Sequence, residues 1–115
     1  KEANNSLAQQ ILFEIYLNYD HISLKQVANK LNYNPSYLGT VFKNAIGESF
    51  HQVLLDKRLT EAYQELLLSS LSIDQIARKV GFTRKTTFYQ GFERKYHKTP
   101  NEIRNEQKQI VHKKY

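Results

Sequence analysis

Three residue types are missing from this 115-residue chain, which has no cysteine, no methionine and no tryptophan. The absence of cysteine excludes disulfide bonds, cysteine-ligated metals and catalysis by a thiolate. Because methionine is lacking even at position 1, we expect the chain to be a fragment excised from a longer protein. Regulation of the full-length protein is then expected to depend on the missing part.

Long apolar runs are lacking as well. No run approaches the roughly 20 residues that cross a bilayer as a helix, and the N-terminus does not have the pattern of a signal peptide. The sequence therefore predicts a soluble, cytoplasmic protein without a membrane partner.

Side chains suited to catalysis or metal binding are few and scattered. The three aspartates are Asp20, Asp56 and Asp74, and the four histidines are His21, His51, His97 and His112. The histidines are not spaced as in H-E-x-x-H, and the sequence has no glycine-rich phosphate loop. We therefore expect no enzyme activity, no cofactor and no metal site.

What the sequence does contain is an internal duplication. The segments that begin at Ser23 and Ser72 align, with one residue inserted in the second copy before Phe92. Identical pairs are Ser23/Ser72, Gln26/Gln75, Ala28/Ala77 and Lys30/Lys79. Pairs of similar character are Leu24/Ile73, Val27/Ile76, Leu31/Val80 and Tyr33/Phe82, followed by the matching pair Phe42/Phe92.

Each copy predicts two short helices joined by a tight turn. The Ser-x-x-Gln at its start is a capping box, and apolar residues follow at helical spacing. The turn falls at residues 32–34 and 81–83, where Asn32 and Gly81 tolerate a positive φ. The second helix is predicted to begin at Asn34, with Pro35 at its first position, or at Thr83 in the second copy.

The second helix of each copy has an apolar inner face and a polar outer face. The inner residues are Leu38, Val41, Phe42 and Ala45 in the first copy and Phe88, Phe92 and Tyr96 in the second. The outer residues are Ser36, Thr40 and Lys43 in the first copy and Thr86, Thr87, Gln90 and Arg94 in the second. Two short helices, a turn of three to four residues and a polar, partly basic second helix are the signature of a helix-turn-helix.

The stretch from Ser49 to Ser69 lies between the copies, and its apolar side changes halfway along. At about 100° per residue, Phe50 and Leu54 lie on one side, whereas Leu59 and Leu66 lie on the opposite side. An ordinary amphipathic helix keeps one apolar stripe. We therefore expect one long helix, opened by a capping box at Ser49, that two small units share.

Helices are also predicted at both ends. Residues 6–19 read as a helix with Leu7, Ile11, Ile15 and Tyr16 on its packed side. A capping box from Thr99 to Glu102 opens a final helix through about Gln107. The expected fold is all-α with about seven helices: an N-terminal helix-turn-helix subdomain (1–48), a linker helix (49–69), a C-terminal helix-turn-helix subdomain (70–107) and a frayed basic tail (108–115).

The net charge of +6 favours an anionic partner. Basic residues gather between positions 84 and 98, where Arg84, Lys85, Arg94, Lys95 and Lys98 stand against Glu93 alone. A solvated helix face is the alternative interpretation of such a run. The second helix-turn-helix beneath it favours contact with phosphates.

The eight tyrosines raise the alternative of a stacking platform for single-stranded nucleic acid. However, Tyr16, Tyr33, Tyr63 and Tyr96 fall on faces that are predicted to be packed. We therefore favour a role in the core for most of them.

These residues together resemble the DNA-binding domain of the AraC/XylS family of bacterial transcription regulators, over about residues 11–104. In the first copy and the long helix, the resemblance rests on Tyr37, Leu38, Phe42, Lys43, Gly47, Phe50, Arg58, Leu59, Ala62, Leu66 and Leu67. The second copy adds Ile76, Ala77, Gly81, Phe82, Phe88, Phe92, Thr99, Pro100 and Arg104. One departure is His97, which stands where the family usually has the helix-ending glycine, so it must adopt a left-handed conformation or the helix must end differently.

The resemblance implies two helix-turn-helix subdomains that bind, as one monomer, two successive major-groove segments of double-stranded DNA. The length of the linker agrees, because a helix of about 20 residues is about 30 Å long and major-groove faces one turn apart are separated by roughly 34 Å.

The family's contact positions, carried over by resemblance, divide between the two second helices. In the first copy the base-contact candidates are Ser36, Gly39 and Thr40, with Lys43 as a phosphate contact. In the second copy they are Lys85, Thr86, Tyr89 and Gln90, with Arg84 and Arg94 as phosphate contacts. Gln90 is the strongest base-contact candidate, since a glutamine amide pairs with adenine through two hydrogen bonds.

An all-helical protein-interaction module that contacts an acidic partner such as RNA polymerase is the alternative function, and it is compatible with DNA binding. RNA polymerase is accordingly an expected partner. An effector or dimerisation domain is expected on the missing part of the chain.

Overall fold

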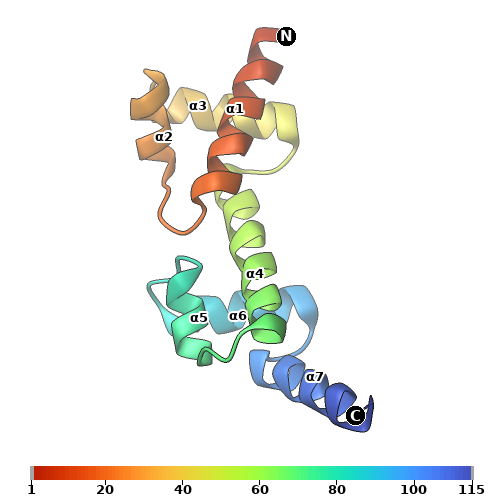
Figure 1. The fold of residues 1–115 in the computed structure, drawn as a ribbon. Coiled ribbons are helices and arrows are strands. Elements are labelled where there is room, and N and C mark those ends of the chain that lie inside the picture. The colour runs from red at the N-terminus through yellow and green to blue at the C-terminus, as the bar shows by residue number, and fades with distance from the viewer. Residues whose placement is uncertain (1, 115) are drawn as a thin grey trace. The chain divides into compact units, whose positions relative to one another are not determined.

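The computed structural model describes the backbone of residues 2–114 and the side chains of residues 4–111. All regular structure in residues 2–114 is helical, as predicted. The helices are α1 (Glu2–Asn18), α2 (Leu24–Leu31), α3 (Pro35–Ile46), α4 (Phe50–Leu68), α5 (Ile73–Lys79), α6 (Lys85–Tyr96) and α7 (Pro100–Lys114) (Figure 1).

Four helices begin with the capping boxes that the sequence predicts. The Oγ of Ser23 accepts from the Gln26 N–H at 3.2 Å, and the Ser23 N–H donates to Gln26 Oε1 at 3.0 Å. Equivalent pairs of hydrogen bonds open α4, α5 and α7, at Ser49/Gln52, Ser72/Gln75 and Thr99/Glu102. Each box satisfies two N–H groups that a helix leaves free at its start.

The chain divides into two compact units, residues 1–57 and 58–115. In the first, called unit 1, α1 and α2 both pack on α3. Its core holds Ile11 and Ile15 of α1, Leu38 and Phe42 of α3, and Phe50 at the start of α4, each at most 4% exposed. An edge-to-face contact between the rings of Phe42 and Phe50, 6.2 Å apart, joins the end of the helix-turn-helix to α4.

The second unit, called unit 2, has an aromatic core. The ring of Phe92 lies 5.7 Å from that of Phe88 and 4.7 Å from that of Tyr96. The ring of Tyr63, on α4, stacks against Phe92 at 6.3 Å. These contacts hold α6 against the second half of α4 by its inner face.

Helix α4 contributes to both cores. Phe50 and Leu54, each 4% exposed, belong to the core of unit 1, whereas Leu59, Ala62 and Leu66 are buried within unit 2. The prediction that one long helix serves two units with different apolar sides is confirmed.

Several details of the prediction are wrong. On α1 the buried residues are Leu7, Ala8, Ile11, Glu14 and Ile15, while Tyr16 is 55% exposed. Glu14 takes an inner position because its carboxylate accepts from Lys30 Nζ at 2.8 Å and from Asn18 Nδ2 at 3.2 Å, which satisfies the buried charge. Tyr33 is also exposed rather than packed, and so is Ala45 on α3.

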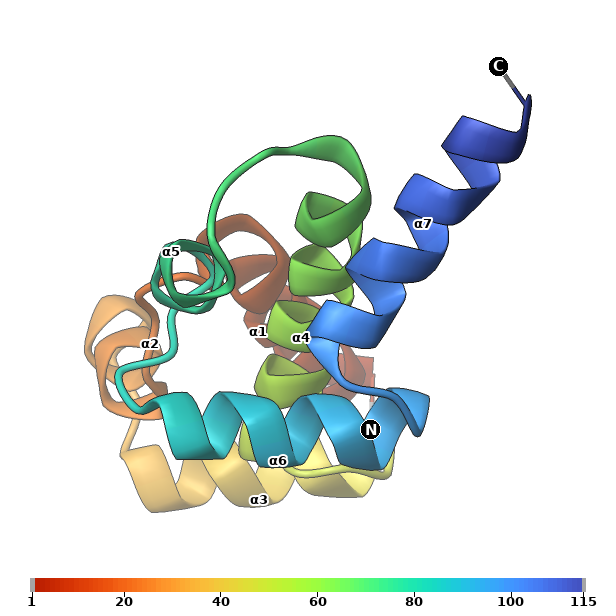
Figure 2. The ribbon, with the colours of Figure 1, turned by 90° about the horizontal axis from the view of Figure 1, so that it is seen from below.

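Helix boundaries also differ, and α1 begins at Glu2 rather than at Ser6. Helix α6 begins at Lys85, with Arg84 rather than Thr83 at the N-cap and no side-chain cap hydrogen bond. The backbone of α7 continues to Lys114 instead of ending near Gln107 (Figure 2). Local sequence sets such ends weakly, because the terminal turns of a helix depend on caps and neighbours more than on propensity. Fraying of residues 108–115 remains a prediction.

Candidate nucleic-acid interface

The two helix-turn-helix motifs share one turn geometry. Asn32 has a φ of 63° and Gly81 a φ of 112°, so a left-handed residue begins each turn, as predicted. The next N–H donates back to the helix at 2.9 Å in both copies, from Tyr33 to Ala28 O and from Phe82 to Ala77 O. The two copies therefore share a positive φ and a backbone hydrogen bond at the turn as well as sequence, and each forms a pair of helices, α2 with α3 and α5 with α6 (Figure 2).

A second shared feature is an ion pair that ties the first helix of each motif to the helix before it. Lys30 Nζ lies 2.8 Å from Glu14 Oε2 in unit 1, and Lys79 Nζ lies 2.8 Å from Glu65 Oε1 in unit 2. The duplicated lysine thus makes the same kind of contact twice. Since Glu14 and Glu65 are 11% and 22% exposed as side chains, these pairs are partly sheltered from screening.

The outer face of α3 carries the four candidates of unit 1. Ser36, Thr40 and Lys43 are exposed, and Gly39 is half-buried. The helix starts firmly, because Asn34 Oδ1 accepts from the N–H groups of Ser36 at 2.8 Å and Tyr37 at 3.2 Å. These four residues line one hollow of about 500 Å³, together with Leu24, Pro35, Asn44, Ser49, Phe50 and His51.

Five of the six candidates of unit 2 lie on α6, and the sixth, Arg84, is its N-cap. Arg84, Lys85, Thr86, Gln90 and Arg94 are exposed, and Tyr89 is half-buried with its ring 5.4 Å from that of Phe88. Phe88 and Phe92, both fully buried, fix this helix from behind. Its last turn carries Arg94 and Lys95, and His97 ends it with a φ of 59°, the left-handed conformation that was one of the two alternatives for this position.

One of these candidates, Lys85, forms an ion pair that is not evident from the sequence. Lys85 Nζ lies 2.7 Å from Asp74 Oδ2, across the turn between α5 and α6. Side-chain exposures of 69% and 43% make this a surface pair, so it contributes little stability. A nucleic-acid contact by Lys85 would have to compete with this carboxylate.

Arg104 has a structural role that the sequence does not reveal. Its Nε donates to Leu66 O at 3.3 Å, its Nη2 donates to Ser69 O at 3.0 Å, and its Nη1 donates to Leu71 O. A guanidinium can satisfy three carbonyls at once because its donors form a rigid fork. From α7, Arg104 therefore fixes the end of α4 and the connection that leads into α5.

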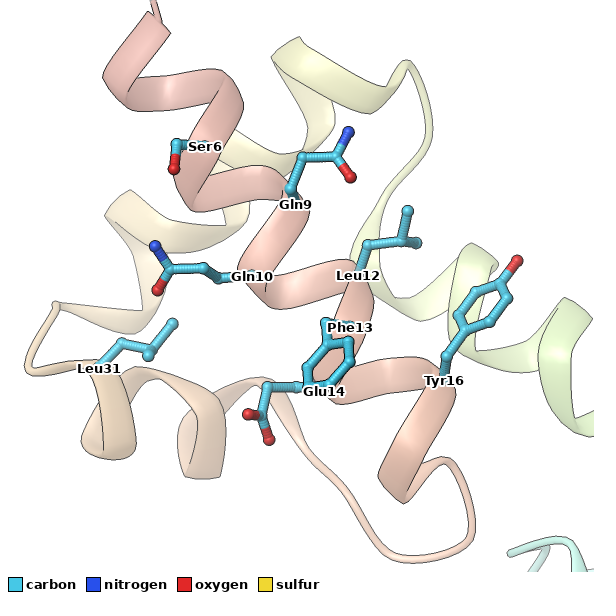
Figure 3. A pocket seen from close by; sticks show the side chains of 8 residues that line it. All are labelled: Ser6, Gln9, Gln10, Leu12, Phe13, Glu14, Tyr16 and Leu31. Atoms are coloured by element: carbon cyan, nitrogen blue, oxygen red, sulfur yellow. The ribbon is translucent and has the colours of Figure 1, made fainter.

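A second hollow in unit 1, of about 690 Å³, lies along α1 (Figure 3). Its lining includes Leu12, Phe13, Tyr16 and Leu31, and it contains none of the predicted DNA contacts. Phe13 and Tyr16 are exposed there because the buried stripe of α1 runs through Ile11 and Ile15 instead.

Neither a metal-binding cluster nor a membrane span is found among the described residues. Among them, no group of three or more His, Asp or Glu side chains is placed to hold a metal ion. No helix in that part of the chain is long and apolar enough to cross a membrane.

Comparison with known proteins relates most of the chain to regulators of transcription. A family model described as "Helix-turn-helix domain" matches residues 27–106. The Escherichia coli K12 protein named "Xylose operon regulatory protein" is 29% identical over 90 residues, which are 78% of this chain and 23% of that protein. The "Urease operon transcriptional activator" of Escherichia coli is 38% identical over 86 residues, which are 75% of this chain and 29% of that protein.

Solved structures agree with the sequence relatives. The C-terminal domain of AraT, a response regulator from Geobacillus stearothermophilus, is 29% identical, with a TM-score of 0.80 over 86% of this chain and 84% of that one. The C-terminal domain of the two-component response regulator yesN from Fusobacterium nucleatum is 32% identical, with a TM-score of 0.75 over 90% of this chain and 99% of that one. The chain thus spans nearly all of these solved domains but only about a quarter of the two curated relatives.

Proposed function

The chain belongs to the AraC/XylS family of transcription regulators, and from that premise we propose that it holds double-stranded DNA by α3 and α6 in two successive major-groove segments. DNA binding in transcription regulation is the function of this domain type. The observation that carries the finer proposal is the duplication. Each unit has a helix that follows the same left-handed turn, with an exposed polar outer face and a buried apolar inner one.

Within this proposal, α3 and α6 make different contacts with the DNA. Gln90, exposed on α6, reads a base edge, and Lys85, Thr86 and Tyr89 support it. Arg84 and Arg94 on α6 and Lys43 on α3 bind phosphates, which fixes the register on the duplex without reading sequence. The side chains at Ser36, Gly39 and Thr40 are too small to reach far into the groove, so α3 reads the bases by close approach of its backbone.

The wider context of the domain is also proposed. The full-length protein acts in the cytoplasm and places its DNA-binding domain near RNA polymerase, as an activator or a repressor of initiation. An effector or dimerisation domain lies in the remainder of the protein. The support for a further domain is that the chain corresponds to 23% and 29% of the two curated relatives, both named as regulators of operons.

A gel-shift series across salt concentrations tests the proposed function. A site is first selected from random duplex DNA and then compared with a scrambled duplex of the same composition. We expect preference for the selected site and a steep fall of affinity with salt, since each neutralised phosphate releases condensed counterions. Equal binding to both duplexes at every salt concentration would reject sequence-specific binding.

A further inference from the structure

The centre of the outer face of α3 lacks a side chain that could reach far into a groove and form two hydrogen bonds with a base, since the longer Lys43 and Asn44 lie nearer the end of the helix. Its central positions are Ser36, Gly39 and Thr40, where the equivalent part of α6 has Gln90. What α3 offers in place of a long side chain is the hollow of about 500 Å³ beside it. Leu24, Pro35 and Phe50 contribute apolar surface to the lining, and Lys43 stands at the same hollow.

Gly39 leaves a methyl group of Leu24 uncovered at this hollow. A Cβ at this position would lie 3.2 Å from Leu24 Cδ2, closer than an ordinary van der Waals contact. The methyl group of Leu24 therefore lies directly beside the backbone of α3, and no side chain at residue 39 covers it. Glycine inside a helix costs about 1 kcal/mol relative to alanine. Gly39 therefore lowers the stability of α3 in exchange for leaving Leu24 uncovered.

The hydroxyl group of Thr40 is already occupied. Its Oγ1 donates to Ser36 O at 3.0 Å, within the same helix. With its donor used in this bond, Thr40 offers a ligand its methyl group and the lone pairs of its hydroxyl oxygen. The polar character that the sequence suggests for this position is thus largely lost in the structure.

Among the groups that base pairs display in the major groove, the C5-methyl of thymine is the apolar one. We propose that the hollow between Gly39, Leu24 and Thr40 receives the C5-methyl of a thymine, so that α3 selects thymine by apolar contact. This inference rests on the proposed DNA-binding function and adds a specificity element to unit 1. The occupant is a base of the duplex rather than a protein segment, since the hollow is continuous with the exposed face of α3 and is bordered by the cationic Lys43.

Replacement of single thymines by deoxyuracil tests this proposal. The exchange removes only the methyl group and leaves every hydrogen-bonding atom of the base in place. Each thymine of the selected site is exchanged in turn, and affinity is measured by gel shift. We expect one or two positions at which affinity falls roughly fourfold, the value of one buried methyl group.

Two variants assign that loss to the hollow. Thr40→Ser removes the threonine methyl. The exchange of thymine for uracil at the same position should then cause little or no loss of affinity. Gly39→Ala fills the opening and should abolish the preference for thymine or reverse it. Thr83→Ser, which removes the same methyl group from unit 2, is the matched control and should leave the penalty unchanged.

The outcomes separate this proposal from the function on which it rests. Uracil tolerated at every position of a selectively bound site would overturn the methyl pocket while leaving DNA binding intact. A penalty that Thr40→Ser and Gly39→Ala both leave unchanged would also overturn it. Failure to select any duplex would remove the proposed function and the pocket with it.

Discussion

At the scale of single residues, Gln90 is the side chain that we propose reads a base edge from α6. It is exposed on the outer face of a helix whose inner face is anchored by Phe88 and Phe92. Gln90→Ala should weaken preference at one or two adjacent base pairs by about 1 to 3 kcal/mol, since it removes a two-bond contact to a base. The base profile is measured by site selection, with the exposed Gln64 changed to alanine as control, and an unchanged profile would refute the assignment.

Arg94 lies on the same helix but is predicted to act differently. As a phosphate contact, its loss should weaken binding to all duplexes alike. Arg94→Ala should also flatten the dependence of log affinity on log salt by about one unit, because one fewer counterion is released. Titrations at several salt concentrations measure both effects. A loss confined to the selected site would instead make Arg94 a base contact.

At the scale of elements, Arg104 fixes the end of α4 and the connection that leads into α5. Its guanidinium satisfies carbonyls of Leu66, Ser69 and Leu71, and an ammonium cannot reproduce this fork. Arg104→Lys should therefore lower the free energy of unfolding by about 1.5 to 3 kcal/mol. Denaturant titration followed by circular dichroism measures this change. Arg78→Lys, an exposed change on α5, is the control, and equal stability of the two variants would contradict the role.

The capping box of α7 should make stability depend on pH. The N–H of Thr99 donates to Glu102, and with the Thr99 hydroxyl it holds the pKa of Glu102 below the usual value for a glutamate. Because the folded pKa is the lower one, the stabilisation is present above the unfolded pKa of about 4.3 and is lost as pH falls through the folded pKa.

Glu102→Gln keeps the acceptor but cannot titrate. The stability advantage of the wild type over this variant should therefore be greatest near neutral pH and shrink below about pH 4.3. Thermal melts from pH 3 to pH 7 measure the difference. Glu48→Gln, the same change at an exposed loop residue, serves as the control, and a difference that stays constant with pH would contradict the prediction.

Most elements could be predicted from the sequence because local chemistry specifies them. The four capping boxes, the positive φ at Asn32 and Gly81, and the change of apolar side along α4 all follow from residue type and spacing. The exposure of Tyr16 and the length of α7 do not. They depend on which neighbour packs against the helix, and spacing alone leaves that open.

The candidate site could be predicted only in part. The sequence indicated which helices present polar faces, and the structure places the predicted residues on those faces. The competition of Asp74 for Lys85 and the placement of Leu24 beside Gly39 are contacts between different helices. Such contacts have no local sequence signal. A glycine inside a helix was the available hint for the hollow.

At the scale of the whole molecule, the central proposal is that unit 1 and unit 2, which share α4, both bind DNA. Each unit has its own core, its own left-handed turn and its own polar outer helix. If both bind DNA at once, the site must contain two contacted segments separated by one helical turn of the duplex, roughly 10 base pairs.

Chemical protection of the selected duplex, read at single-base resolution, measures this most directly. Methylation reads guanine N7 in the major groove, and 7-deaza-adenine and uracil substitutions read the adenine and thymine positions of the same duplex. The account predicts two protected groups on one face of the duplex, centred roughly 10 base pairs apart. Gln90→Ala should weaken protection in one group more than in the other. A single protected group, or protection that leaves the major groove untouched, would contradict the account.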